Sequence, residues 1–333
     1  MAGRSHLKRT QIVGTGSAVP EKVLTNFDLE KMVDTSDEWI RVRTGIQRRH
    51  IADEKTTSAT LASEAAQKAL KDAGLSAQDV DFILVATVTP DMPFPATGCL
   101  VQESLGATKA AAMDLSAGCS GFIYALSLAD ALIRSGNGEN ILVIGVETLS
   151  KIIDWTDRNT CVLFGDGAGA VVLTPTEEEG RGLIASHARS DGSLGALLML
   201  PGGGSKNPTS LHTVEQRMHF IKMNGHDLFR PAILSMVEAA LCVLQKAGLN
   251  SEQVDLLIPH QANLRIIDAV AKKLKLPREK VYVNLDEYGN TSAASIPIAL
   301  DEAKRKGVIR PDNLVLMVAF GAGLTWGAAL LRV

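Results

Sequence analysis

The chain has 333 residues and a mass of 35.4 kDa, enough for about two domain-sized units with a sizeable core. Hydrophobic residues make up 46% and charged residues 21%, which excludes disordered, collagen-like and coiled-coil chains and predicts a soluble, folded protein. A net charge of −3, from 34 Lys and Arg against 37 Asp and Glu, excludes the global basic field of a nucleic-acid-binding protein.

The N-terminus and the cysteines indicate a cellular location. Residues 1–9 are basic, but no apolar stretch follows them, so we expect no signal peptide. The four cysteines, Cys99, Cys119, Cys161 and Cys242, form no C-x-x-C pair and have no histidines at zinc-ligand spacing. We therefore expect no disulfide, no metal and a cytoplasmic, reducing location.

An internal repeat organises the chain. The segment LKDAGLSAQDVD at 70–81 returns as LQKAGLNSEQVD at 244–255, with six of twelve positions identical. The same offset of 174 residues places the apolar run 141–145 on the run 315–319. We therefore expect two similar halves.

Each half has the pattern of an α/β domain. A helix that ends at a glycine, Gly74 or Gly248, precedes a short apolar strand, a second helix and another apolar strand. The polar stretch 174–180 separates the halves, which we place at 1–174 and 175–333.

One cysteine lies where reactive thiols are found. The second helix of the first half is expected from about Cys119 to Ser135, apolar almost all round and buried centrally. Ser116-Ala-Gly-Cys-Ser-Gly121 places Cys119 in its first turn, between small residues that let a substrate approach. Free N–H groups and the helix dipole predict a lowered thiol pKa and donors for an oxyanion. The alternative is a small buried hydrophobic residue, our interpretation of the other three cysteines.

Two further polar residues lie at element ends of the second half. His260 follows the strand 255–259, and Asn290 precedes the helix that repeats the Cys119 helix. Singly, each is an ordinary loop or cap residue. In the repeat, however, His260 corresponds to Ala86 and Asn290 to Ser116. Because strand exits and helix entries of open α/β sheets face one crevice, we expect thiol, imidazole and carboxamide to meet between the halves.

The uncharged stretch 314–331 resembles a membrane span and contains Gly323-x-x-x-Gly327. Its glycine-rich centre, 320–324, would break a helix, and its flanks predict two buried strands joined by a tight turn. We expect no membrane span.

Five motifs in register resemble the thiolase-fold condensing enzymes, most closely the β-ketoacyl-acyl carrier protein synthase III family. They are Gly118-Cys-Ser-Gly121, Phe164-Gly-Asp-Gly-Ala-Gly169, His260-Gln-Ala-Asn263, Tyr288-Gly-Asn-Thr-Ser292 and Phe320-Gly-Ala-Gly-Leu-Thr-Trp-Gly327. The resemblance covers the chain after about Thr10. It implies an α/β, thiolase-like fold, two duplicated halves related by a pseudo-two-fold axis and layered α-β-α-β-α.

The resemblance also implies an acyltransferase that initiates fatty acid synthesis without metal or organic cofactor. Cys119 would take the acyl group from acyl-CoA. His260 and Asn290 would then stabilise the enolate formed as malonyl-acyl carrier protein loses carbon dioxide, and the enolate would attack the thioester to give a β-ketoacyl-acyl carrier protein. The backbone N–H groups of Cys119 and Ala322 would hold the tetrahedral oxyanion.

Binding residues follow from the same resemblance. For CoA they are Thr35, Trp39, Arg43, Arg158, Gly225, Phe229 and Asn263. For the acyl carrier protein they are Gln261, Ala262, Asn263, Leu264, Arg265, Lys272, Lys273 and Arg230, on a local basic surface whose other interpretation is an exposed helix face. The acyl pocket would be lined by Phe94, Leu149, Phe164 and Phe320, with Phe94-Pro95 reaching into a partner subunit, so a homodimer is implied.

Several alternatives stay open. Polyketide- or quinolone-type enzymes share the fold and the Cys-His-Asn set, a cysteine hydrolase also uses Cys, His and Asn, and an acyl-binding paralogue would lack activity. A dinucleotide enzyme is disfavoured because a strand, not a helix, follows Gly165-x-Gly-x-x-Ala170. The length and branching of the acyl primer are not determined by the sequence.

Overall fold

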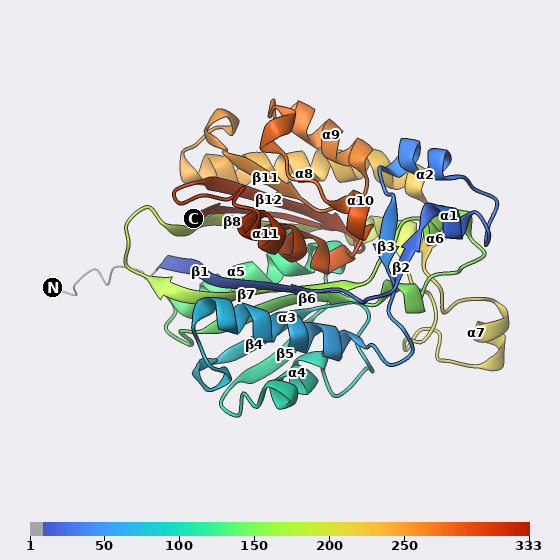
Figure 1. Cartoon of the computed structure of the whole chain (residues 1–333), viewed down its shortest axis with the longest axis horizontal. Helices are drawn as coiled ribbons and strands as arrows, with labels where there is room; N and C mark the ends of the chain where they lie inside the picture. Colours follow the sequence, from blue (N-terminus) through green and yellow to red (C-terminus); the bar gives the residue numbers. More distant parts are fainter. Residues whose placement is uncertain (1–8) are drawn as a thin grey trace.

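A computed structural model describes residues 9–333, so the basic segment 1–8 lies outside the described residues. Two β-sheets stack with helices between them and helices on both outer faces (Figure 1). The layers therefore run α-β-α-β-α, and the expected thiolase-like fold class is confirmed.

The first sheet belongs to the N-terminal half and has the strand order β1-β7-β6-β4-β5. β4 pairs in parallel with β5 and β6, whereas β7 runs antiparallel to β6 and β1. All seven residues of β6 are buried, as expected of a strand covered on both faces. The strands are β1 (Arg9–Ala18), β4 (Phe82–Ala86), β5 (Ala111–Leu115), β6 (Ile141–Glu147) and β7 (Gly167–Thr176).

The second sheet has the order β11-β12-β13-β8, with β11 parallel to β12 and the other pairs antiparallel. Its strands are β8 (Gly182–Ser190), β11 (Leu256–Pro259), β12 (Leu314–Gly321) and β13 (Thr325–Arg332). The stretch 314–331 thus forms two buried strands, as predicted. Over residues 9–333, no helix is long and apolar enough to cross a membrane.

Two helices fill the layer between the sheets. α5 (Gly121–Arg134) and α11 (Ser295–Arg305) contact strands of both sheets. Gly145 of β6 permits the close approach of the α11 entry, because a Cβ there would lie 2.2 Å from Ala293 O. Large apolar side chains of α5 such as Phe122 are fully buried, each contributing roughly 1.5–3 kcal/mol to stability.

The outer layers repeat one another. α3 (Ser58–Ala73) and α4 (Thr97–Leu105) cover the first sheet, and α8 (Gly225–Ala247), with α9 (Leu264–Lys273) beside it, covers the second (Figure 1). α3 and α8 both end at a left-handed glycine, Gly74 with φ 67° and Gly248 with φ 68°. The 174-residue offset therefore holds in three dimensions.

Two details of the halves differ from expectation. β7 continues to Thr176, so a boundary at 174 falls inside a strand of the first sheet, and the connection between the sheets is 177–181. This correction arises because Thr174 to Thr176 pair with β1 despite their polar sequence. β5 has no full counterpart in the second sheet, where Val281 forms a single parallel bridge to Leu257.

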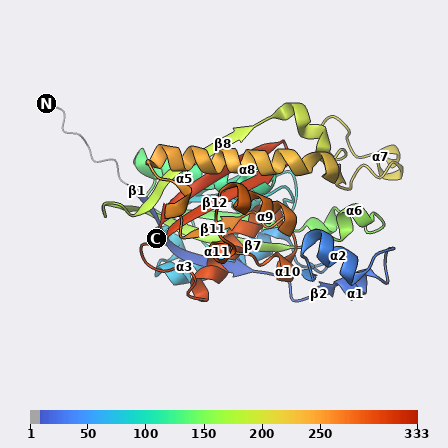
Figure 2. The ribbon, with the colours of Figure 1, turned by 90° about the horizontal axis from the view of Figure 1, so that it is seen from above.

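The shorter elements gather mainly at one end of the molecule. Both views place α1, α2, α6 and α7 at the end far from the C-terminus (Figures 1 and 2). The helices are α1 (Asn26–Leu29), α2 (Asp37–Thr44), α6 (Arg158–Cys161), α7 (Leu211–Glu215) and α10 (Leu285–Tyr288). The short strands are β2 (Val23–Thr25), β3 (Arg48–His50), β9 (Leu198–Met199) and β10 (Lys222–Met223). The 3-10 helices are η1 (Ala77–Asp79), η2 (Gly118–Ser120), η3 (Leu149–Lys151), η4 (Gly192–Leu197), η5 (Ser251–Gln253), η6 (Arg278–Lys280) and η7 (Ser292–Ala294).

Candidate active site

Cys119 lies in η2, immediately before α5, so the central helix begins two residues later than the sequence predicts. The turn after β12 packs directly on this segment. A Cβ on Gly321 would lie 2.4 Å from the backbone nitrogen of Cys119, and a Cβ on Gly118 would lie 2.7 Å from that of Ala322. The structure thus brings the two amides expected to bind an oxyanion to the same place.

The pKa of the Cys119 thiol differs from expectation. Burial, with a smaller contribution from the nearby Glu147 carboxylate, raises it to about 12, although a hydrogen bond with the Ser292 side chain acts in the opposite direction. The predicted lowering at the helix start is therefore outweighed by desolvation. The thiol needs a proton acceptor before it can act as a nucleophile.

His260 directly follows β11 and is 4% exposed. Its Nδ1 lies 2.7 Å from Ser295 Oγ, which accepts a hydrogen bond from the Gln261 N–H. Ser295 can donate its own hydrogen to Nδ1, and in that tautomer the ring proton lies on Nε2. Burial lowers the pKa of His260 to about 4, so the ring is neutral at pH 7, and in this tautomer Nε2–H is a donor.

Asn290 lies just before η7 and is buried, with its backbone fixed on both sides. Its N–H donates to Leu163 O at 2.8 Å, and its carbonyl accepts from the Gly165 N–H at 3.0 Å. The side-chain Oδ1 accepts from the Ser292 N–H at 2.9 Å. This leaves the Nδ2 group as the donor that the carboxamide offers to the cavity.

These three side chains line one cavity of about 140 Å³. The predicted meeting of thiol, imidazole and carboxamide is therefore found, from η2, the end of β11 and the segment before η7. The CoA-binding candidates Gly225, Phe229 and Asn263 also line it, as do the acyl-pocket candidates Phe164 and Phe320 and the carrier candidate Ala262.

A second, more apolar cavity of about 230 Å³ adjoins Cys119. Leu149 and Phe164 line it, together with Ile152, Leu198 and Ile221. Phe94 does not line it within the described chain. It is 85% exposed on the loop before α4, where its expected role requires a partner subunit.

The candidate adenine site is formed by α2 and α6. The guanidinium carbons of Arg43 and Arg158 each lie 4.8 Å from the centroid of the Trp39 ring. An adenine placed between Trp39 and Arg158 would therefore have to displace that guanidinium. The buried Thr35 Oγ1 has no hydrogen-bond partner within residues 9–333, and Asn263 Nδ2 donates to Arg43 O at 3.1 Å, which ties this region to the catalytic cavity.

The cations of the basic surface lie where the sequence predicts, on the outside of the molecule. Arg230, Arg265, Lys272 and Lys273 are exposed on α8 and α9. Leu264, however, is only partly exposed because it packs on Gly45.

Gln261 is 1% exposed, and its amide is bonded to Pro259 O, Tyr282 O and the Asn284 N–H. Its expected role as a carrier-protein contact is therefore wrong, because the side chain is buried and its hydrogen bonds are internal.

Three functional candidates were missed in the sequence. Ser292 and Ser295 hold Asn290 and His260, and both lie in or next to a motif already singled out. Glu147 is fully buried at the end of β6, and its carboxylate accepts from Ser292 Oγ at 3.0 Å. The sequence feature that could have identified Glu147 is a single carboxylate at the end of an apolar strand.

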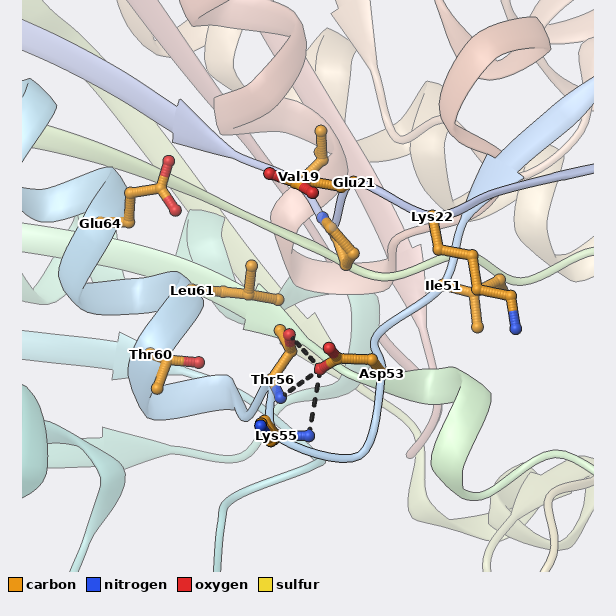
Figure 3. A pocket seen from close by; sticks show the side chains of 11 residues that line it. Val19, Glu21, Lys22, Ile51, Asp53, Lys55, Thr56, Thr60, Leu61 and Glu64 are labelled. Atoms are coloured by element: carbon orange, nitrogen blue, oxygen red, sulfur yellow. Dashed lines mark hydrogen bonds between the residues drawn. The ribbon is translucent and has the colours of Figure 1, made fainter.

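Another cavity of about 630 Å³ lies away from this chemistry, between α3 and the loops after β1 and β3 (Figure 3). Its lining mixes acidic Glu21 and Glu64 with basic Lys22. Asp53 accepts from the amides of Lys55 and Thr56 and so closes its own loop. The described part of the chain contains no group of three or more His, Cys, Asp or Glu placed to hold a metal ion.

Comparison with known proteins agrees with this site. A family model described as 3-oxoacyl-[acyl-carrier-protein] synthase III matches residues 113–192, and the model of its C-terminal part matches residues 244–333. The β-ketoacyl-[acyl-carrier-protein] synthase III of Caldanaerobacter subterraneus subsp. tengcongensis is 58% identical over 321 residues, which cover 96% of this chain and 97% of that protein.

Solved structures agree as well. The crystal structure of 3-oxoacyl-[acyl-carrier-protein] synthase III from Aquifex aeolicus has a TM-score of 0.91 at 53% identity, covering 97% of this chain and 100% of that chain. The priming β-ketosynthase from the R1128 polyketide pathway has a TM-score of 0.90 at 34% identity, covering 99% and 98%. The chain belongs to the 3-oxoacyl-[acyl-carrier-protein] synthase III family.

Proposed function

We propose that this protein initiates fatty acid synthesis by condensing an acyl-CoA with malonyl-acyl carrier protein. The observation that carries the proposal is the single cavity lined by the Cys119 thiol, the His260 imidazole and the Asn290 carboxamide, beside an apolar pocket. Family membership supports the same reaction. Its products are a β-ketoacyl-acyl carrier protein, carbon dioxide and CoA.

The reaction runs in two half-reactions on Cys119. Its sulfur attacks the acyl-CoA thioester, CoA leaves, and the backbone amides of Cys119 and Ala322 hold the oxyanion. Malonyl-acyl carrier protein then loses carbon dioxide. His260 Nε2–H and Asn290 Nδ2–H donate to the enolate oxygen, and the enolate carbon attacks the Cys119 thioester. The neutral imidazole suits this role because its Nε2–H can donate without the ring first gaining a proton.

The remaining assignments belong to the same proposal. CoA would lie along Trp39, Arg43 and Arg158 toward Gly225, Phe229 and Asn263, and no metal or organic cofactor is required. The acyl carrier protein, which is acidic, would dock on the exposed cations of α8 and α9.

We place the enzyme in the cytoplasm as a homodimer. β5 is an edge strand, and the adjacent loop exposes the large apolar side chain of Phe94, which favours burial against a second copy.

The test is the intact mass of the protein after brief incubation with a panel of acyl-CoAs, without carrier protein. The wild type should gain one acyl group, and the added mass identifies the primer. Cys119→Ser should gain none, whereas Cys99→Ser, which changes an exposed cysteine, should be acylated like the wild type. Absence of any adduct on the wild type would overturn the proposal and reopen the hydrolase and acyl-binding alternatives.

A further inference from the structure

A fully buried carboxylate lies behind the nucleophile. Glu147 ends β6 in the interior, and hydroxyls and one amide surround it. Thr89 Oγ1 donates to Oε2 at 2.6 Å, the Val88 N–H donates at 3.1 Å, and Thr87 Oγ1 lies at 3.4 Å. These neighbours carry no charge. Burial raises the pKa of Glu147 to about 7, so the carboxyl exchanges its proton near neutral pH.

Ser292 connects this carboxyl to the nucleophile. Its Oγ donates to Glu147 Oε1 at 3.0 Å, and its side chain, which lines the same apolar cavity as Cys119, lowers the pKa of the Cys119 thiol. Its backbone N–H meanwhile holds Asn290 Oδ1. Ser292 has a φ of 48°, a conformation uncommon for a residue other than glycine. The turn therefore aims one residue at Cys119, Glu147 and Asn290 at once.

The other titratable side chain of the site is poorly placed to accept the thiol proton. With Ser295 donating to Nδ1 at 2.7 Å, the proton of the neutral His260 ring lies on Nε2. An imidazole in that form offers the cavity a donor rather than an acceptor. The Ser292 hydroxyl, by contrast, can accept from the thiol while passing its own proton to Glu147.

We infer that Glu147 and Ser292 form a proton relay that stores the proton of Cys119 while the acyl group is bound. The inference rests on the proposed function and adds to it a positioning residue, Ser292, and a buried acid–base group, Glu147. It assigns to the N-terminal half the proton transfer that the neutral His260 does not perform.

The proton balance closes over one turnover. As Cys119 Sγ bonds to the acyl carbon, its proton moves to Ser292 Oγ and the Ser292 proton moves to Glu147 Oε1. The C–S bond to CoA breaks, and CoA leaves as a thiolate that takes a proton from water. In condensation, the C–S bond to Cys119 breaks with its electron pair on Sγ, which regains a proton from Ser292 as Glu147 returns one to Ser292.

If Glu147 acted only through its charge, neutralising it would have the opposite effect on the acylation rate. Its negative charge raises the pKa of the Cys119 thiol, so neutralising it would by itself lower that pKa and speed acylation. Loss of a relay slows acylation instead. The groups facing Glu147 are the hydroxyls of Thr87, Thr89 and Ser292, the Val88 amide and, across Ser292, the Cys119 thiol, which is the titrating partner.

The test measures the rate of acyl-enzyme formation by rapid quench and intact mass between pH 5.5 and 9, using the acyl-CoA that modifies the wild type. The wild-type rate should rise as Glu147 ionises and level off above about pH 7. Glu147→Gln should be acylated about 10²-fold more slowly at pH 7, the usual size of a lost acid–base group, with a rate that climbs tenfold per pH unit. Ser292→Ala, which keeps the backbone N–H to Asn290, should show the same loss.

The double variant and a matched control complete the design. Because both changes break one relay, Glu147→Gln combined with Ser292→Ala should be no slower than either alone. Asp166→Asn neutralises another buried carboxylate, bonded to Ser150 and Ala52, and should keep the wild-type pH profile.

Two outcomes overturn the relay and are distinguishable from failure of the proposed function. A Glu147→Gln protein that is acylated at or above the wild-type rate would show that Glu147 acts only through its charge. If that variant does not fold, Ser292→Ala with unchanged acylation overturns the relay. A wild type that forms no adduct overturns the proposed function, and the relay with it.

Discussion

The two halves are built from the same elements but carry different side chains at matching positions. Cys119 in the N-terminal half corresponds to Ala293, and His260 in the C-terminal half corresponds to Ala86. Glu147 at the end of β6 corresponds to Gly321 at the end of β12. At each of these positions, one half carries the reactive group and the other carries a small residue.

The small residues are required because the segments that carry them pack closely around the site. A Cβ on Gly321 would lie 2.4 Å from the nitrogen of Cys119, and a Cβ on Gly121 would lie 2.9 Å from the Cβ of Ala86. A larger side chain at Gly321 or Gly121 would therefore displace its neighbour. Duplication supplies more positions than a single half, and the site uses one member of each matching pair for a reactive side chain.

The strongest way to break this division is Gly321→Ala. The added Cβ would collide with backbone atoms of Cys119, which cannot rotate away as a flexible side chain can. We expect acyl-enzyme formation to fall about 10³-fold, because the nucleophile and its oxyanion donor both move, and stability to fall by about 1–3 kcal/mol. Quenched-flow mass spectrometry and denaturant unfolding measure the two effects.

Gly192→Ala is the control, since a Cβ there meets no atom within 4 Å. It should keep wild-type acylation and stability. A Gly321→Ala enzyme that is acylated normally would show that the close approach of the halves has no catalytic importance.

The different roles of the side chains also predict that some variants slow one half-reaction and not the other. His260→Ala and Asn290→Ala remove donors that act on the enolate, so each should reduce carbon dioxide release from malonyl-acyl carrier protein by about 10²-fold. The acyl adduct on Cys119 should still form at a rate within a few-fold of the wild type. Release of labelled carbon dioxide and intact mass measure the two steps separately. Equal loss of both steps would contradict the separate roles.

Much of this arrangement could be predicted from the sequence because the repeat carries positional information. The offset that relates 70–81 to 244–255 located the matching strands, and a strand exit and a helix entry located His260 and Asn290 near Cys119. Glu147 was accessible to the same argument, since it closes an apolar strand whose counterpart ends at Gly321. Comparing side chains at every strand exit, rather than only histidine and asparagine, would have found it.

Other features depend on three-dimensional packing and could not be read from the pattern. Gln261 follows His260 directly and looks like a surface amide, but the chain folds its side chain into three internal hydrogen bonds. The pKa of Cys119 depends on how much solvent reaches the thiol, and burial outweighs the helix dipole. Sequence spacing reports neither quantity.

Glu147 in the N-terminal half and His260 in the C-terminal half should have opposite effects on the free energy of unfolding as pH changes. Burial lowers the pKa of His260 from 6.5 to about 4, so in acid the unfolded chain binds a proton that the native state refuses, and stability falls. Burial raises the pKa of Glu147 from 4.5 to about 7, so the native state already holds its proton, and stability rises as pH falls from 7 to 4.5. The two slopes largely cancel.

Removing one of the two groups makes the pH dependence of stability that the other produces measurable. Between pH 6.5 and 4.5, Glu147→Gln should lose about 2 kcal/mol more unfolding free energy than the wild type, at up to about 1.4 kcal/mol per pH unit. His260→Asn should change in the opposite direction. Urea unfolding at several pH values measures both, with the exposed Glu64→Gln as control. Parallel stability profiles for all four proteins would contradict the opposed burial of the two groups.

The smallest expected effect concerns the surfaces of the two halves and the binding of the carrier protein. After β4 the N-terminal half has an apolar loop that exposes Phe94, whereas after β11 the C-terminal half has the basic helix α9. Lys272 and Lys273 lie in its last turn, so reversing both charges should raise KM for malonyl-acyl carrier protein about three- to tenfold, less at high salt. Arg265 is a poorer choice, because its guanidinium carbon lies 5.5 Å from the centroid of the Phe229 ring in the catalytic cavity.

The same lysine variant should be acylated by acyl-CoA at the wild-type rate, because neither lysine lines the cavities beside Cys119. Lys68→Glu combined with Lys71→Glu, at two exposed lysines on α3 over the opposite sheet, changes the net charge by the same amount and should leave KM unchanged. An equal rise in KM for both proteins would mean that the carrier protein senses only total charge. A rise confined to Lys272 and Lys273 would instead assign carrier recognition to the C-terminal half and leave the apolar loop of the N-terminal half for a second subunit.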